Sequence, residues 1–189
     1  GGLIIRQFKD AGVWEILLLR SFFFIIALTL FLLLTYKKDT FKVIKSSGFP
    51  AVVGGLFLSL SFVAYTFGIM ATSVANVVFI ISTQTIFLAI FGYFFLKEKI
   101  SIKGFISIIL AMSGIVIMVG DSLTTGSLLG NLVALAIPIN FSILVMIIRK
   151  YPKLDMVPAI FYSGILGCIY GFIFSKSLHF SLHDIFMGF

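Results

Sequence analysis

The amino-acid sequence predicts an all-α fold, a polytopic transmembrane helix bundle. Of its 189 residues, 60% are hydrophobic and only 11% are charged, and the apolar residues come in long unbroken blocks. A soluble domain has about a quarter of its residues charged, so this composition is typical of a chain surrounded by lipid. The bilayer is therefore the first expected partner, and a soluble globular domain is excluded.

Six apolar segments are each long enough to cross a bilayer as a helix. Spanning the hydrocarbon core takes about 20 mostly apolar residues, whereas the strands of a membrane barrel are about 10 residues long. The segments are apolar all round, as lipid-embedded helices are. They are 13–36, 50–70, 72–96, 104–120, 128–148 and 157–175. Only the first carries charges, Glu15 and Arg20, both near its start.

The basic residues indicate how this bundle is oriented. Ten of them lie in the connections 37–49, 97–103 and 149–156, which alternate with connections that carry few or none. The positive-inside rule makes these three connections cytoplasmic, so we expect a multi-pass protein of the cell (inner) membrane. The basic residues form no aromatic-interleaved face that could follow a phosphate backbone, and nucleic acid is not an expected partner.

A short internal match predicts the organisation of the bundle. Residues 3–8 resemble residues 146–151, at an offset of 143 residues between Arg6 and Arg149. In so Ile-rich a chain, an Ile-Ile-Arg match also arises by chance. Five predicted spans lie between Arg6 and Arg149. Because an odd number of spans ends on the opposite side of the membrane, the two copies would have opposite orientations. Inverted repeats recur in secondary transporters, whose substrate site lies near the membrane midplane between the halves.

The match predicts two inverted five-helix repeats, the second of them truncated. Residues 1–120 are expected to form the first repeat, with its first helix mostly missing. Residues 121–189 are expected to begin the second repeat, with its later helices missing. We therefore expect the chain to be a fragment of a protein with about ten spans.

Four motifs follow one another along the chain: WEIL at 14–17, ATSVANVVFIIS at 71–82, FFLKEKIS at 94–101 and AMSGIV at 111–116. In this order they resemble the EamA-type drug/metabolite transporter (DMT) superfamily. The resemblance implies a permease with ten helices in two inverted five-helix halves. The family often has a proline midway along its fourth helix, where this chain has Thr85. The resemblance then implies that hydroxyl groups and the Gln84 amide supply polarity there.

Seven side chains within the predicted spans are candidates for a substrate site: Arg20, Tyr65, Asn76, Gln84, Thr85, Asn140 and Tyr162. Arg20 lies about 9 Å along its helix, where it either attracts a carboxylate or snorkels outward beside Glu15. The three amides need hydrogen-bond partners in lipid, so they either line a site or join helices. Asn140 follows Pro138, which leaves a backbone carbonyl unbonded nearby. The two tyrosines either stack on a substrate or pack against other helices.

No catalytic residue, metal site or cofactor is expected. His179 and His183 are spaced as i and i+4, but no other Cys or His completes a metal site, so we interpret the pair as incidental. The sequence contains no Walker-type phosphate loop. The pairs Gly167-xxx-Gly171 and Ala64-xxx-Gly68 favour close helix packing and leave a homodimer open.

Together these features predict a secondary transporter for a small-molecule substrate. It would move small metabolites, amino acids or related solutes, across the cytoplasmic membrane by alternating access. We do not expect an enzyme, because the predicted spans hold neither paired Asp residues nor a His cluster. A non-transporting membrane scaffold, or an intramembrane enzyme completed by the missing helices, is the alternative.

Overall fold

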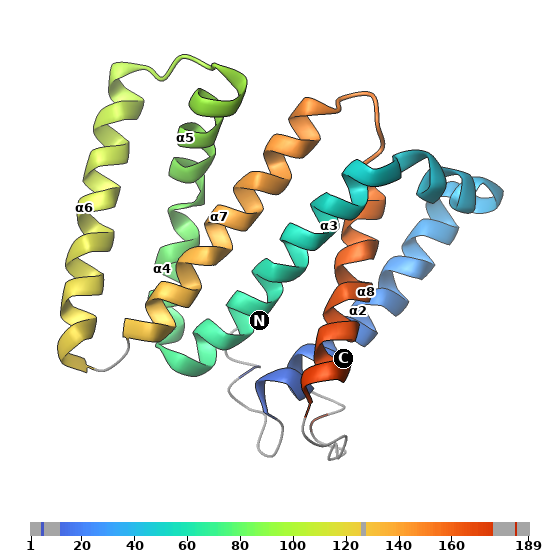
Figure 1. Ribbon diagram of the computed structural model, residues 1–189, viewed down its shortest axis with the longest axis horizontal. Helices are drawn as coiled ribbons and strands as arrows, with labels where there is room; N and C mark the ends of the chain where they lie inside the picture. Colours follow the sequence, from blue (N-terminus) through green and yellow to red (C-terminus); the bar gives the residue numbers. More distant parts are fainter. Residues whose placement is uncertain (1–4, 6–11, 126–127, 176–183, 185–189) are drawn as a thin grey trace.

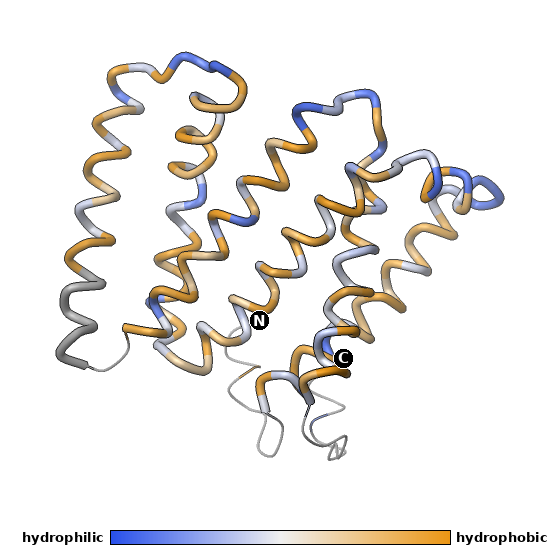
Figure 2. The backbone as a smooth tube through the Cα atoms, in the orientation of Figure 1, coloured by the Kyte–Doolittle hydropathy of each residue, from blue (hydrophilic) through white to orange (hydrophobic). Residues whose placement is uncertain are grey.

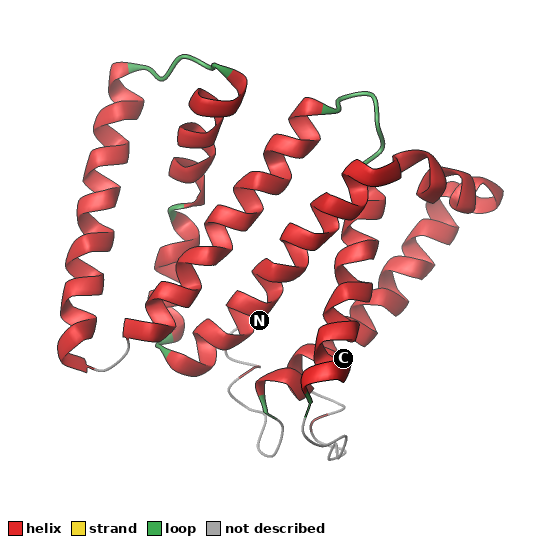
Figure 3. Ribbon diagram, in the orientation of Figure 1, coloured by secondary structure: helices red, strands yellow, loops and turns green. Residues whose placement is uncertain are grey.

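The computed structural model describes residues 5, 12–125, 128–175 and 184, without the side chains of 118–125. The described residues form helices joined by short connections, with no strand among them (Figure 3). In chain order the elements are α2 (Val13–Tyr36), the 3-10 helix η1 (Lys37–Asp39), α3 (Thr40–Ala71), α4 (Val74–Ser82), α5 (Gln84–Leu96), α6 (Ile102–Thr125), α7 (Leu128–Lys150) and α8 (Val157–Phe174).

Helix length and composition confirm a polytopic membrane helix bundle. Within the described part of the chain, 4 helical stretches are long and apolar enough to cross a membrane: Val13–Ala71, Val74–Leu96, Leu128–Lys150 and Val157–Phe174. The first stretch contains both α2 and α3, which run in opposite directions (Figure 1). The apolar part of α6, Ile102–Ile117, is shorter. The chain is therefore a multi-pass membrane protein.

Helix α3 lies at the centre of the arrangement. It packs along α7 and α8, while α8 also packs along α2 (Figure 1). Helices α4 and α5 follow α7, and α6 lies at the outer edge. The three lysine-rich connections fall at one end of the bundle, where Figure 2 shows the hydrophilic residues gathered. Alternate connections therefore share one face, as the charge pattern predicts.

Two helices extend beyond their predicted ends. Helix α3 begins at Thr40 instead of residue 50, so most of the predicted connection 37–49 is helical. Gly48 interrupts this helix with a left-handed φ of 59°, a conformation open to glycine because it has no Cβ. Helix α6 continues to Thr125, past the predicted end at residue 120. A helix can extend beyond the hydrocarbon layer because water satisfies its last carbonyl groups.

Helices α2 and α8 pack closely along a line of glycines. A Cβ atom at Gly171 would lie 2.7 Å from Leu18 Cβ, and one at Gly167 would lie 2.4 Å from Ser21 Oγ. Gly164 approaches Ile25 in the same way, farther along the pair. The predicted small-residue pair at 167 and 171 thus serves packing within this chain.

The two helices also run antiparallel and are joined at both ends. Tyr36 Oη donates a hydrogen bond to Asp155 Oδ2 over 2.5 Å at one end. At the other end, Ser175 Oγ donates to Glu15 Oε1 over 2.7 Å. The sequence offset of 143 residues pairs the start of α2 with the residue before α8. The division into inverted repeats stays a prediction.

Candidate functional site

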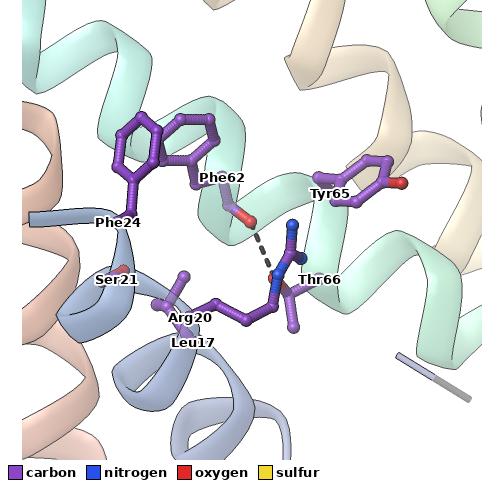
Figure 4. A pocket seen from close by; sticks show the side chains of 7 residues that line it. All are labelled: Leu17, Arg20, Ser21, Phe24, Phe62, Tyr65 and Thr66. Atoms are coloured by element: carbon purple, nitrogen blue, oxygen red, sulfur yellow. Dashed lines mark hydrogen bonds between the residues drawn. The ribbon is translucent and has the colours of Figure 1, made fainter. Parts of the chain in front are cut away.

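A cavity of about 160 Å³ lies between α2 and α3, in the half of the bundle away from the lysine-rich connections. Its residues are Leu17, Arg20, Ser21, Phe24, Phe62, Tyr65 and Thr66. Figure 4 shows the first four side chains coming from α2 and the other three from α3. The walls are mostly apolar and aromatic, with one guanidinium and a few hydroxyl groups as the polar features. This composition is typical of a small-molecule site.

Arg20 brings a positive charge into this cavity. It lies seven residues into α2, about 10 Å along the helix axis. Its guanidinium carbon is 5.6 Å from the centroid of the Tyr65 ring, within cation–π range. Within the described residues no carboxylate forms an ion pair with Arg20. A charge at this depth is costly without a partner, so the cavity is suited to an anionic group.

Whether Arg20 attracts a carboxylate or snorkels outward beside Glu15 stays a prediction, and the surroundings of the two side chains differ. Glu15 is buried and accepts a hydrogen bond from Ser175, the residue that follows α8. Arg20 instead extends toward Tyr65 and Thr66 of α3 (Figure 4). The Thr66 hydroxyl donates to the Phe62 carbonyl over 3.0 Å, so its oxygen lone pairs remain to accept from a ligand or from Arg20.

The third apolar segment, 72–96, is interrupted in its middle. Helix α4 ends at Ser82 and α5 begins at Gln84, with Thr83 between them. The Ser82 and Thr83 hydroxyls each donate over 2.6 Å to a carbonyl one turn back, those of Phe79 and Ile80. The hydroxyl bonds therefore satisfy carbonyls at the break without a proline. Discontinuous helices form ion and substrate sites in transporters, and here a single residue with right-handed angles (φ −77°, ψ −1°) interrupts the helix.

Gln84 and Thr85 directly follow this break. The Gln84 side chain is half-buried and that of Thr85 is exposed. The interruption falls two residues before Thr85, the position that the sequence resemblance indicated. Hydroxyl groups lie at this interruption, and those of Ser82 and Thr83 donate hydrogen bonds to backbone carbonyls.

Asn76 belongs to a buried polar cluster that joins three helices. Its amide Nδ2 donates to Thr72 Oγ1 over 3.0 Å and to Asn131 Oδ1 over 3.3 Å. Thr72 Oγ1 in turn donates to Asn131 Oδ1 over 2.7 Å. Asn131 is fully buried in the first turn of α7, and its Nδ2 has no hydrogen-bond partner in the structure. These bonds connect the end of α3, the start of α4 and α7.

Sequence reasoning missed Thr72 and Asn131. Asn131 lies within the predicted span 128–148, so the rule that selected the other amides could have found it. Its partners, Thr72 and Asn76, lie 59 and 55 residues earlier in the chain, and no local pattern indicates that pairing.

Asn140 and Tyr162 lie apart from the Arg20 cavity. Asn140 is half-buried in α7, and the carbonyl of nearby Pro138 accepts from Ser142 Oγ over 2.6 Å. Tyr162 packs against α3, where a Cβ atom at Gly55 would lie 2.6 Å from Tyr162 Cβ. The structure thus brings Arg20 and Tyr65 together and places the other five candidates elsewhere.

Metal chemistry has no visible support in the described residues. No group of three or more His, Cys, Asp or Glu side chains that could hold a metal occurs among them. His179 and His183, which the sequence analysis interpreted as incidental, lie outside the described residues.

The several helices long enough to cross a membrane, the interrupted segment 72–96 and the cavity that holds Arg20 define a candidate membrane transporter. A comparison with protein families agrees: the model of the EamA-like transporter family matches residues 2–120. The chain belongs to this family, so it is a membrane transporter of the drug/metabolite type. No curated protein and no solved structure matches the chain.

Proposed function

We propose that the protein is a secondary transporter that moves small metabolites, amino acids or related solutes, across the cytoplasmic membrane. It works by alternating access, with the lysine-rich connections 37–49, 97–103 and 149–156 on the cytoplasmic side. The family supports transport, and the arrangement of the charges supports this orientation.

The observation that carries the choice of solute is the guanidinium in the cavity between α2 and α3. Arg20 offers several N–H donors in a planar fork that matches a carboxylate. Tyr65 and Phe62 offer aromatic surface to the rest of a small solute. Water is scarce at this depth, so a charge-assisted hydrogen bond there contributes more than it would in solution. An amphiphilic carboxylate fits both parts of the cavity.

Two other functions remain as alternatives. A membrane scaffold has no need of a positive charge held in a lined cavity, so Arg20 favours transport over that role. An intramembrane enzyme would need a group of reactive side chains within the spans. Neither alternative explains an interruption of segment 72–96 at hydroxyl-bearing residues, whereas transporters use helix interruptions for binding and for movement.

Flux measurements in reconstituted vesicles test the proposal. A panel of radiolabelled carboxylate solutes and their uncharged analogues is offered to the wild type and to Arg20→Gln. We expect carboxylate flux in the wild type and an apparent KM about 10- to 100-fold higher in the variant, the equivalent of one charged hydrogen bond. Arg20→Lys should restore part of the affinity.

Lys42→Gln is the matched control, because it removes one positive charge from an exposed position on α3. Its apparent KM should equal that of the wild type. Absence of flux for the whole panel would contradict transport of these solutes. An unchanged KM in Arg20→Gln, with flux intact, would contradict the assigned role of Arg20.

A further inference from the structure

A second cavity lies between α5 and α7, at the lysine-rich end of the bundle. Its volume is about 300 Å³. Its lining residues are Phe91, Phe95, Leu96, Ile143, Met146, Ile147 and Lys150. Six of the seven are apolar, and the Lys150 ammonium is the single charge. This cavity shares no residue with the one that holds Arg20.

One lysine lines this cavity and two more follow its lining residue Leu96 in the sequence. Leu96, a lining residue, is followed directly by Lys97, and Lys99 lies two residues farther on. The nearby carboxylate of Glu98 is already bound to Arg149 through two contacts of 2.9 and 3.0 Å. Within the described residues no carboxylate forms an ion pair with Lys97, Lys99 or Lys150.

Aromatic residues place this end of the cavity at the membrane–water boundary. Phe94 and Phe95 at the end of α5 are 71% and 70% exposed. Tyr151 follows α7, and its ring centroid is 5.8 Å from Lys150 Nζ. Aromatic and basic residues gather at the level of lipid headgroups. The apolar part of the cavity therefore faces the acyl region, and its charged part faces the headgroups.

We propose that this cavity binds an anionic phospholipid. Lys150 holds the headgroup phosphate, with Lys97 and Lys99 adding to the positive potential. The acyl chain lies along the apolar walls that α5 and α7 provide. Basic pockets between transmembrane helices on the cytoplasmic side are suited to this ligand class. A water-soluble anion would leave the six apolar side chains without a contact, which is why the lipid is the ligand we assign.

A bound lipid would also strengthen a weak part of the bundle. The lipid would contact both α5 and α7. It would join these two helices close to the exposed ion pair between Glu98 and Arg149. A ligand that binds only the folded protein raises its apparent stability by mass action. Thermal stability therefore reports on occupancy without any measurement of transport.

The experiment titrates phosphatidylglycerol or phosphatidylcholine into the purified protein in detergent. The readouts are the midpoint of thermal unfolding and the lipid retained in native mass spectrometry. We expect saturable stabilisation by phosphatidylglycerol and little by phosphatidylcholine. Lys150→Gln should weaken phosphatidylglycerol binding about fivefold, the contribution of one basic residue near anionic headgroups.

Two further variants separate charge from shape. Lys42→Gln removes a lysine on the same face, outside the lining, and should bind phosphatidylglycerol as the wild type does. Ile143→Trp should fill the cavity and abolish retention of the lipid. If this variant does not fold, the exposed substitution Lys150→Gln still decides the question.

Three results would overturn the proposal. One is equal binding of the two lipids, and another is equal weakening by Lys150→Gln and Lys42→Gln. The third is displacement of phosphatidylglycerol by millimolar inorganic phosphate, which would indicate a site for a free anion. None of these results bears on solute flux, so this proposal and the transport proposal can fail separately.

Discussion

The α2–α8 pair and the outer helix α6 are all largely apolar, but their surroundings are very different. Along α2–α8, glycines bring the two backbones so close that a Cβ at Gly171 would lie 2.8 Å from the Leu18 Cα. On α6, a Cβ at Gly114 would meet only Phe79 Cζ, at an ordinary 3.4 Å. Side chains at both ends of the described part of α6, Ile102 and Ile117, are 80% and 73% exposed.

The difference shows what holds helices together in lipid. Acyl chains are as apolar as leucine, so burying apolar side chains does not by itself drive association. Small residues in register allow close van der Waals contact, and α8 has them on the face toward α2. The exposed face of α6 lacks such a partner among the described helices and is suited to contact with lipid.

The largest expected effect comes from breaking the glycine line. Gly171→Ala places a methyl group against the Leu18 backbone, so α2 and α8 must separate. We expect a loss of about 1–3 kcal/mol in the free energy of unfolding, typical of overpacking. Gly114→Ala on α6 is the control and should leave stability nearly unchanged. Thermal unfolding in detergent measures both, and equal losses would contradict the contrast between the two regions.

A smaller effect is expected at the polar cluster that ties α4 to α7. Asn131→Ala removes the acceptor of two hydrogen bonds in a fully buried position. We expect a cost of about 1–2 kcal/mol, the upper part of the range for hydrogen bonds between membrane helices. Asn140→Ala, at a half-buried amide of the same helix, should cost less than half as much. A larger loss in the control would mean that Asn140 contributes more to packing than its surroundings indicate.

The smallest effect is expected for the ion pair between Glu98, in the connection after α5, and Arg149 of α7. The side chains of Arg149 and Glu98 are 44% and 50% exposed, so water screens their attraction. Glu98→Gln should lower stability by about 0.2–1 kcal/mol. The loss should diminish as salt is raised from 0.05 to roughly 0.5 M, because screening lengths shorten. A loss that is independent of salt would indicate a structural role beyond charge pairing.

Helix positions were largely predictable because the bilayer sets their length. Predicted and observed bounds agree for 13–36 and differ by one residue for 157–175. Thr40–Ser47 was not predicted to be helical, because five of its eight residues are polar or charged, which excludes a membrane span without excluding a helix. The interruption at Thr83 was not predicted either. It depends on which hydroxyl group donates a hydrogen bond to a carbonyl in the preceding turn.

The candidate site was less predictable than the fold. The depth of Arg20 followed from its place in an apolar run, and the structure adds Tyr65 as its neighbour from another helix. Asn76 was correctly expected to need partners, but Asn131 and Thr72 meet it only through tertiary packing. Tyr162 and Tyr65 look alike in the sequence, and helix rotation alone decides that only Tyr65 faces Arg20.

The hydrogen bonds at the two ends of the α2–α8 pair have a mechanical consequence. The bonds of Tyr36 with Asp155 and of Ser175 with Glu15 fix the two ends of the pair. Between them, the glycine line holds the two helices in close contact. The α2–α8 pair would therefore tilt as one unit instead of sliding along its length. Bending that opens or closes a path through the membrane would then occur at helix interruptions such as Gly48 and Thr83.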